Sequence, residues 1–319
     1  MSNPVHDLTY RNYDGPMLGT DRRWWPIAKA QMSKVLKNRW LWVCMMMGGW
    51  YYFVMMVIIF IMEQVASAGG PQGSGAMNNF IGQLIWKDQF VIGFSYGQLI
   101  FLIMAWIIGS GSIANDNRAN ALLVYLSKPC SKLEYVFGKW LGIFLPLLLL
   151  QAIPGAFFYL YGALSWTDYG FIKSDPSIPF KMLILLPLSA SLHASLILGI
   201  SSLFKQGRLA GATYAGVYFL SNWMAQIAVI LYQIQLKHRG IDGISSGVKT
   251  LYYSSVDGIQ IGLAKLIFGT HGSTQFGLQS PVPPMRMPGS WWPLLVWAIL
   301  TGFGFWIAWR KVQAVEVSG

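Results

Sequence analysis

The stretch WLGIFLPLLLLQAIPGAFFYLYGALSWT, residues 140–167, contains no Asp, Glu, Lys or Arg. A transmembrane helix needs about 20 apolar residues to cross roughly 30 Å of hydrocarbon, so this stretch is long enough to span a bilayer. Five other apolar windows are also free of charge and long enough. In chain order the six windows are residues 40–62, 89–114, 140–167, 182–204, 209–236 and 287–309. The sequence therefore predicts an all-α integral membrane protein with six transmembrane helices.

The composition agrees with this fold class. Of 319 residues, 54% are hydrophobic and 11% are charged, whereas soluble domains carry roughly 25% charged residues. So few charges cannot cover the surface of a soluble protein of this size, which excludes a cytosolic enzyme and a disordered tail. A net charge of +11 raises the question of nucleic acid, which the positions of the basic residues decide. Cys44 and Cys130 form neither a disulfide framework nor a zinc pattern.

The basic residues indicate the orientation of the six helices. With the N-terminus inside, the cytoplasmic segments hold 15 of the 23 Lys and Arg residues. Because cytoplasmic loops carry an excess of Lys and Arg, both termini are predicted to be cytoplasmic, and no nucleic-acid partner is needed to explain the charge. The first apolar run is too late and too long for a cleaved signal peptide. We expect a cytoplasmic segment at 1–39, a membrane domain at 40–310 and a cytoplasmic tail at 311–319.

The segment before the first span has the spacing of a basic amphipathic helix. Its apolar side chains recur at helical intervals between Lys and Arg residues. Such a helix can lie on anionic lipid headgroups, or it can contact a cytoplasmic partner; the two roles are compatible. The residues assigned to this interface helix are Trp25, Lys29, Met32 and Leu36.

The connection between the second and third spans, residues 115–139, is longer than a simple connector requires. Asp116 or Asn117 is positioned to cap a short helix, and Pro129 ends it. The apolar residues of this helix are Leu122, Leu123 and Leu126.

A second helix begins directly after Pro129. Ser131 and Glu134 have the spacing of a capping box, which opens a helix that continues past Lys139 into the third span. We therefore expect two rigid helices to meet at a sharp corner on the cytoplasmic side.

Two external connections are also distinctive. The glycine-rich stretch within residues 65–86 predicts a loop. Residues 237–286 carry an apolar helical stripe that Lys249, Asp257 and Lys265 interrupt, so no charge-free run long enough to span remains. This segment predicts an interfacial or re-entrant helical element, followed by a Pro-rich loop. It either packs over the outer ends of the spans or serves as an outer lid.

The six spans lack the side chains that several functions require. None contains an ionisable carboxylate, Lys or Arg, which disfavours a self-powered ion-coupled pump. The sequence has no GxxxxGK[ST] phosphate loop, so no ATP site of that kind is expected. His193 is the only histidine within a span, and we interpret it as a satisfied core residue rather than a ligand. No catalytic residue and no metal site are predicted.

Uncharged polar residues do occur in the second and fifth spans. Ser95 and Gln98 lie in the second span, and Asn222 and Gln226 lie four residues apart in the fifth. They can be hydrogen-bonding contacts between helices, or they can line a polar pathway. The sequence leaves both interpretations open.

One stretch of the inner connection matches a known pattern. From Leu122 it reads Leu-Leu-Val-Tyr-Leu-Ser-Lys-Pro-Cys-Ser-Lys-Leu-Glu-Tyr, and Gly138-Lys139 follows. It resembles the cytoplasmic signature of ABC-2 type transporter permeases, with Lys128 and Lys132 where arginines are common. The six-span layout and the tetrapeptide Asn-Tyr-Asp-Gly from Asn12 are also similar to that family. The segment Asp-Asn-Arg-Ala-Asn from Asp116 has fewer acids than is usual there.

The resemblance implies a permease subunit in the plasma (inner) membrane, paired with a second copy or a related permease. It implies two separate ATPase subunits that bind ATP and Mg, with no cofactor in this chain. The first cytoplasmic loop of that family is the coupling helix that docks on the ATPase. The matching residues here are Asp116, Asn117, Arg118, Leu122, Leu123, Leu126, Lys128 and Pro129. The second and fifth spans of that family line the path at the dimer interface, which favours a lining role for the four polar residues.

Two functions follow from these expectations. The first is an ABC exporter permease for a lipid, polysaccharide, peptide or drug-like solute. The alternative is a non-transporting membrane anchor that transmits ATPase motion to an external partner at residues 237–286. An intramembrane enzyme lacks any clustered nucleophile, acid–base pair or metal site in this sequence.

Overall fold

The computed structural model describes residues 23–121, 130–240, 243, 245–275, 278–279 and 285–312, with backbone alone at 71–74, 76, 274–275 and 278–279. The helices are α1 (Trp24–Leu36), α2 (Arg39–Gly48), α3 (Trp50–Ala68), α4 (Gly70–Gln83), α5 (Trp86–Tyr96), α6 (Gln98–Gly109), α7 (Ala114–Arg118), α9 (Lys132–Ser165), α10 (Phe171–Ser174), α11 (Ile178–Ser202), α12 (Gly207–Arg239), α13 (Ser246–Tyr252), α14 (Val256–Phe268) and α15 (Trp292–Lys311). Two antiparallel strands of two residues each, β1 (Thr274–Gln275) and β2 (Leu278–Gln279), follow α14.

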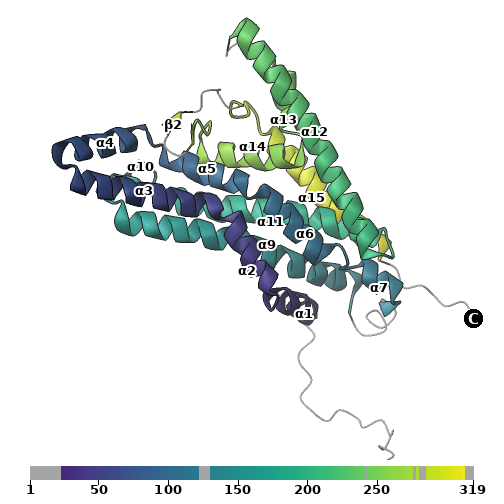
Figure 1. Ribbon diagram of the computed structural model, residues 1–319. Helices are drawn as coiled ribbons and strands as arrows, with labels where there is room; N and C mark the ends of the chain where they lie inside the picture. The colour runs from purple at the N-terminus through teal and green to yellow at the C-terminus, as the bar shows by residue number, and fades with distance from the viewer. Residues whose placement is uncertain are drawn as a thin grey trace, which may run out of the picture.

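Six of these helical segments are long and apolar enough to cross a membrane, which confirms the predicted fold class. They are Trp50–Ala68, Gln98–Arg118, Lys132–Ser165, Ile178–Ser202, Gly207–Arg239 and Trp292–Lys311. The chain is therefore a multi-pass membrane protein. Figure 1 shows α3 and α4 at one end of the bundle, and α1 and α7 at the other. The charge distribution predicts that the α1–α7 end is cytoplasmic.

The first span differs from its predicted range of 40–62, because the helix is interrupted at Gly49. A Cβ at Gly49 would lie 2.5 Å from the Cβ of Pro154 in α9. The second span is interrupted at Gly97, where a Cβ would lie 3.1 Å from the carbonyl oxygen of Gly48. The two interruptions therefore face each other, and glycine is needed there because no side chain fits between the helices.

The stretch 65–86 is helical, so the prediction of a loop was wrong. Helix α4 folds back along α3 and packs against it (Figure 1). Glycine destabilises a helix by about 1 kcal/mol per residue relative to alanine. Tertiary packing outweighs this cost, because Met77 and Leu84 are both buried in the main apolar core.

Helix α11 lies at the centre of the bundle, in contact with α6, α9, α12, α14 and α15. Its closest approach is to α15. A Cβ at Gly199 would lie 2.5 Å from the carbonyl oxygen of Gly304, and a Cβ at Gly304 would lie 2.5 Å from that of Ser195. Small residues bring membrane helices close enough for backbone van der Waals contact, which is a main source of helix association in lipid.

The predicted external element forms two helices, α13 and α14, separated at residues 253–255. Helix α14 begins at Ser255, whose Oγ accepts a hydrogen bond from the N–H of Gly258 at 2.9 Å. The helix packs against α5, α11, α12 and α15, so it is part of the bundle. The Pro-rich loop at 281–284 lies outside the described residues.

Helices α9 and α12 are the longest, at 34 and 33 residues. At 1.5 Å per residue each is about 50 Å long, which exceeds the hydrocarbon thickness of a bilayer. Figure 1 shows that α9 runs along the whole bundle, whereas α12 leans away from it at the end opposite α7. One side of α12 is consequently exposed and apolar, including Leu220 and Trp223 at 64% and 71% exposure.

Candidate functional site

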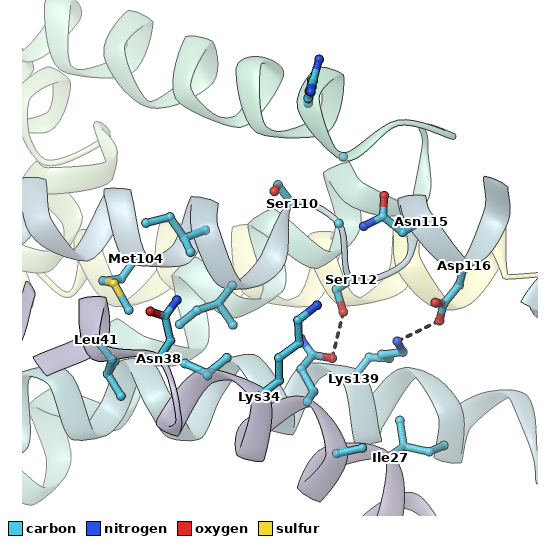
Figure 2. A pocket seen from close by; sticks show the side chains of 18 of the residues that line it. Ile27, Lys34, Asn38, Leu41, Met104, Ser110, Ser112, Asn115, Asp116 and Lys139 are labelled. Carbon is cyan, nitrogen blue, oxygen red and sulfur yellow. Dashed lines mark hydrogen bonds and ion pairs between the residues drawn. The ribbon is translucent and has the colours of Figure 1, made fainter. Parts of the chain in front are cut away.

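The inner connection begins with α7, and Asp116 fixes this helix to α9. Asp116 Oδ2 accepts a hydrogen bond from the hydroxyl of Tyr135 at 2.7 Å and pairs with Lys139 Nζ at 2.8 Å. Figure 2 shows the ion pair between the two helices. The Asp116 and Lys139 side chains are 19% and 12% exposed, so the pair is largely shielded from water. One carboxylate therefore joins α7 to the first turns of α9.

The opposite side of α7 is fixed to α11. Asn117 donates through Nδ2 to the carbonyl oxygens of Ser202 at 3.3 Å and Phe204 at 3.2 Å. Ser201 Oγ accepts a hydrogen bond from the N–H of Ala114 at 3.1 Å. These bonds satisfy polar groups at the end of α11 and at the start of α7, where a helix leaves backbone groups unpaired.

The short helix that Asp116 or Asn117 was predicted to cap, with Leu122, Leu123 and Leu126, lies outside the described residues. Asp116 and Asn117 themselves lie within α7, which begins at Ala114. At the start of α7, Ser201, from a distant part of the sequence, supplies the acceptor for the backbone N–H groups of Ile113 and Ala114. Helix α7 ends before Asn120, whose φ of 51° is left-handed.

The capping box that opens α9 is confirmed. Ser131 Oγ accepts from the N–H of Glu134 at 3.2 Å, and Glu134 Oε2 accepts from the N–H of Ser131 at 2.7 Å. Helix α9 therefore starts at Lys132 and continues into the third span, as the sequence predicts.

Only part of the predicted coupling helix lies within the described residues. Asp116 and Asn117 contact neighbouring helices, and Arg118 is exposed. The remaining predicted docking residues, Leu122, Leu123, Leu126, Lys128 and Pro129, lie outside the described residues. The structure defines the two flanking elements, which are α7 before this segment and the start of α9 after it.

The predicted N-terminal interface helix is α1, and it packs directly on α9. A Cβ at Gly138 would lie 2.7 Å from the carbonyl oxygen of Trp24, and a Cβ at Gly142 would lie 2.9 Å from the Cβ of Gln31. Ala28 is completely buried in this contact. The absence of side chains at two positions one turn apart thus lets α1 lie close against α9.

The four residues assigned to the interface helix differ in how far they are buried. Trp25 and Lys29 are exposed, whereas Met32 and Leu36 are half-buried. Because α1 and α7 both contact the first turns of α9, the interface helix and the inner corner are supported by the same helix.

The four candidate pathway residues have different surroundings. Ser95 and Gln98 donate to carbonyl oxygens of their own chain segment, at Ile92 and Phe94. Asn222 is half-buried, and Gln226 is exposed on α12. Among the described residues no hydrogen bond joins the pair on α5 and α6 to the pair on α12, and Gln98 Oε1 is buried without a partner.

Asp257 of α14 forms a polar contact with α12 that was not predicted from the sequence. Asn222 Nδ2 donates to Asp257 Oδ2 at 2.7 Å, and the N–H of Asp257 donates to Asn222 Oδ1 at 3.4 Å. Burial raises the pKa of Asp257 to about 6, while hydrogen bonds from Tyr218 and Asn222 oppose the rise. The signal in the sequence is a carboxylate that interrupts an otherwise apolar helical stripe.

His193 is completely buried and has partners at both ring nitrogens. Gln260 of α14 donates to Nε2 at 2.8 Å, and Nδ1 contacts the hydroxyl of Tyr214. Ser189 donates in turn to Gln260 Oε1. This network joins α11, α12 and α14, and it explains why a lone histidine is tolerated in a span.

A second set of buried polar groups lies at the C-terminal end of α14 and in the segment that follows it. Asp88, at the start of α5, is completely buried and accepts from Thr270 Oγ1 and from the N–H of Ser273, the latter at 2.9 Å. Lys265 Nζ donates to the carbonyl oxygen of Met285 at 2.6 Å. Burial lowers the pKa of Lys265 to about 8, although the Asp88 charge opposes this.

Comparison with known proteins confirms the resemblance to ABC-2 type permeases. The family model described as ABC-2 family transporter protein matches residues 25–278, from α1 to β2. A comparison with curated proteins gives no match. The match includes the inner corner, the interface helix and five of the six membrane-crossing helices. Members of this family are transmembrane subunits and not the subunits that hydrolyse ATP. The match covers most of the chain, and we conclude that the chain belongs to the ABC-2 family and is a membrane permease subunit of an ABC transporter.

Proposed function

We propose that the chain works as an exporter subunit in the plasma membrane, coupled to two separate ATPase subunits. The ATPases bind ATP and Mg, and this chain supplies the pathway together with a second permease. The cargo class is a lipid, polysaccharide, peptide or drug-like solute. Movement of the ATPases is transmitted through the segment between α7 and α9.

The observation that carries this proposal is the attachment of α7, at the start of the inner connection, to α9. Asp116 bonds both Tyr135 and Lys139 in the first turns of α9, directly after the capping box at Ser131. A displacement at the corner therefore acts on a helix of 34 residues that continues through the bundle. Asn117 transmits the same displacement to the end of α11.

The proposed pairing with a second permease is supported by α12. The exposed side of this helix carries Gln226 among large apolar residues, close in sequence to Asn222. Pairing through α12 would bring polar groups of two chains to a shared pathway, while the apolar residues pack around them.

The docking assignment is tested by replacing two leucines of the connecting segment. Leu122→Asp with Leu123→Asp is expected to abolish co-purification of the ATPase, because two carboxylates cannot be buried in an apolar contact without partners. Leu122→Ile with Leu123→Ile is the matched control and is expected to retain the ATPase. Both variants are expected to be inserted in the membrane at the wild-type level. Full ATPase recovery with the aspartate variant would contradict the assignment.

A second function is supported by the outer end of the molecule. Helix α14 is buried in the bundle, and Asp88 holds the following segment against α5. Motion of the spans would thus be carried to residues 237–286 and to an external partner. Cargo movement by the purified complex in vesicles supports the exporter. ATPase activity that responds to an external protein, without cargo movement, supports this second function.

A further inference from the structure

A cavity of about 900 Å³ lies at the α1–α7 end of the bundle. It is lined by α1 and the start of α2 on one side and by α6 and α7 on the other, with Lys139 of α9 and the start of α12 completing the lining. Figure 2 shows side chains from these elements converging on the space, among them Lys34, Met104 and Ser112. Because α1 is the interface helix, the cavity is expected at the level where lipid headgroups meet the hydrocarbon.

One half of the cavity is apolar. Its walls there are formed by Trp40 and Leu41 of α2 and by Met104, Ile107 and Ile108 of α6. Trp40 and Ile107 are 58% and 53% exposed, so apolar surface remains available to a ligand. A small hydrated anion would leave this surface in contact with water, whereas an alkyl chain would cover it.

The other half is positively charged. Lys34, Arg118 and Arg208 line the cavity, and none of them forms an ion pair with a described residue. Among the described lining residues the one carboxylate, Asp116, is already paired with Lys139. An anionic group in the cavity therefore has three cations available to it, one each from α1, α7 and α12.

An unpaired amide points to the same kind of ligand. Gln31 lines the cavity, and its Oε1 accepts a hydrogen bond from Ser112 Oγ at 3.1 Å. Its Nε2 is buried and has no hydrogen-bond partner. A buried N–H group without a partner among the described residues is costly, so a ligand oxygen that came within hydrogen-bond distance of this amide would be favoured.

We propose that this cavity binds an anionic phospholipid of the inner leaflet. The phosphate oxygens accept hydrogen bonds from Lys34, Arg118 and Arg208, since guanidinium groups suit phosphate geometry, and from the Gln31 amide. One acyl chain lies along Leu41, Met104 and Ile107. Basic pockets between membrane helices at the cytoplasmic side bind lipid headgroups in this way. All of these residues belong to this chain, so lipid binding can be measured without the ATPase, although Arg118 is also one of the predicted ATPase-docking residues.

The experiment uses the purified full chain and compares three probes. Phosphatidylglycerol is expected to raise the thermal midpoint and to remain bound in native mass spectrometry. Phosphatidylcholine tests whether the net negative charge matters, and inorganic phosphate tests whether the acyl chain matters. We expect phosphatidylglycerol to bind at least tenfold more tightly than either. Equal binding of phosphatidylcholine, or full competition by inorganic phosphate at the same concentration, would overturn the proposal.

Two double variants locate the site. Lys34→Gln with Arg208→Gln removes two cavity charges and is expected to weaken phosphatidylglycerol binding about tenfold or more. Lys37→Gln with Lys311→Gln removes two exposed charges outside the cavity lining and is expected to leave binding unchanged. Equal effects of both variants would contradict the location.

A measurement on the unmodified chain keeps the proposal testable if the cavity variant does not fold. Phosphatidylglycerol with a photoreactive diazirine in its acyl chain is expected to label peptides from α6, and unlabelled phosphatidylglycerol is expected to suppress that labelling. Labelling that is spread over the lipid-exposed helices, with no enrichment in α6, would overturn the assignment.

Discussion

Among the described residues, Asp116 supplies the hydrogen bond and the ion pair that fix α7 to α9. Its carboxylate bonds both Tyr135 and Lys139, and the ion pair is four-fifths or more shielded from water. Removing one member of a buried pair leaves the other charge uncompensated, which costs more than the pair itself contributes. The residue is therefore expected to matter for stability and for transmission of force.

Asp116→Ala is expected to lower the free energy of unfolding by about 3 kcal/mol, because Lys139 is left without its partner. Lys139→Met alone should destabilise by a similar amount. The double variant should cost less than the sum of the two, since neither charge then remains. Thermal unfolding in detergent measures all three, and strictly additive losses would contradict the coupling.

Lys265 is expected to make the stability of the native protein depend on pH between about 8 and 10.5. Its pKa is lowered from 10.5 to about 8 by burial. Between these values the unfolded chain holds a proton that the native chain has lost, so native stability rises with pH across this window. The thermal midpoint of the wild type is expected to rise relative to Lys265→Met from pH 8 to pH 10. Parallel pH profiles of the two proteins would exclude this contribution.

Two elements, α1 and α9, are joined by the close approach at Gly138 and Gly142. A side chain at Gly138 meets the backbone oxygen of Trp24 and the Cβ of Ile27, neither of which can rotate away. The interface helix must therefore shift as a body if Gly138 is replaced. Its position on α9 depends on the shape of the groove more than on its own amphipathic pattern.

Gly138→Ala is expected to destabilise the protein by about 1–3 kcal/mol through overpacking. It should also increase trypsin cleavage at Lys29 and Lys34 of α1. Gly302→Ala, in α15, is the matched control because a Cβ there meets nothing within 4 Å. The control is expected to be neutral or stabilising by up to about 1 kcal/mol through helix propensity. Identical behaviour of the two variants would argue against close packing of α1 on α9.

Three of the described membrane-crossing helices are incompletely packed: at most 22% of the most apolar window is buried in α3, α12 and α15, and α12 is the longest of the three. Only 22% of the most apolar window of α12 is buried, against 67% for α11. The remaining surface faces either lipid or a second permease. Under the proposed function, it forms the contact between two permease subunits.

Cross-linking distinguishes these two environments for α12. Leu220→Cys is expected to cross-link to a second copy with a short bis-maleimide in native membranes, after Cys44 and Cys130 are replaced by serine. Leu183→Cys on α11 is the control, since Leu183 is 71% exposed but lies on a different helix. Cross-linking at both positions alike, or at neither, would count against a homodimer through α12.

The six membrane-crossing segments could be predicted because the bilayer imposes a local rule on each of them. A window such as 182–204 is apolar and charge-free whatever its neighbours are. The capping box at Ser131 and Glu134 was predictable for the same reason, since both partners lie within four residues of each other. Local chemistry was sufficient in these cases.

Other features depend on residues that are distant in the sequence. The helix α4 forms despite its glycines because α3 covers it, and α7 starts at Ala114 because Ser201 of α11 pairs with its backbone. Asp257 could be seen to interrupt an apolar stripe, but its pairing with Asn222 on α12 could not.

The sequence by itself determined the class of the protein, its number of spans and the family pattern at the inner corner. Hydrophobic length, charge placement and short capping motifs act within a few turns of helix, so they can be recognised without a fold. Only the tertiary structure decided which helices touch, where glycines bring backbones together and which charges are paired. Those outcomes depend on packing between helices far apart in the chain. One of them is the cavity beside α1, which is lined by apolar side chains and by three cations that form no ion pair with a described residue.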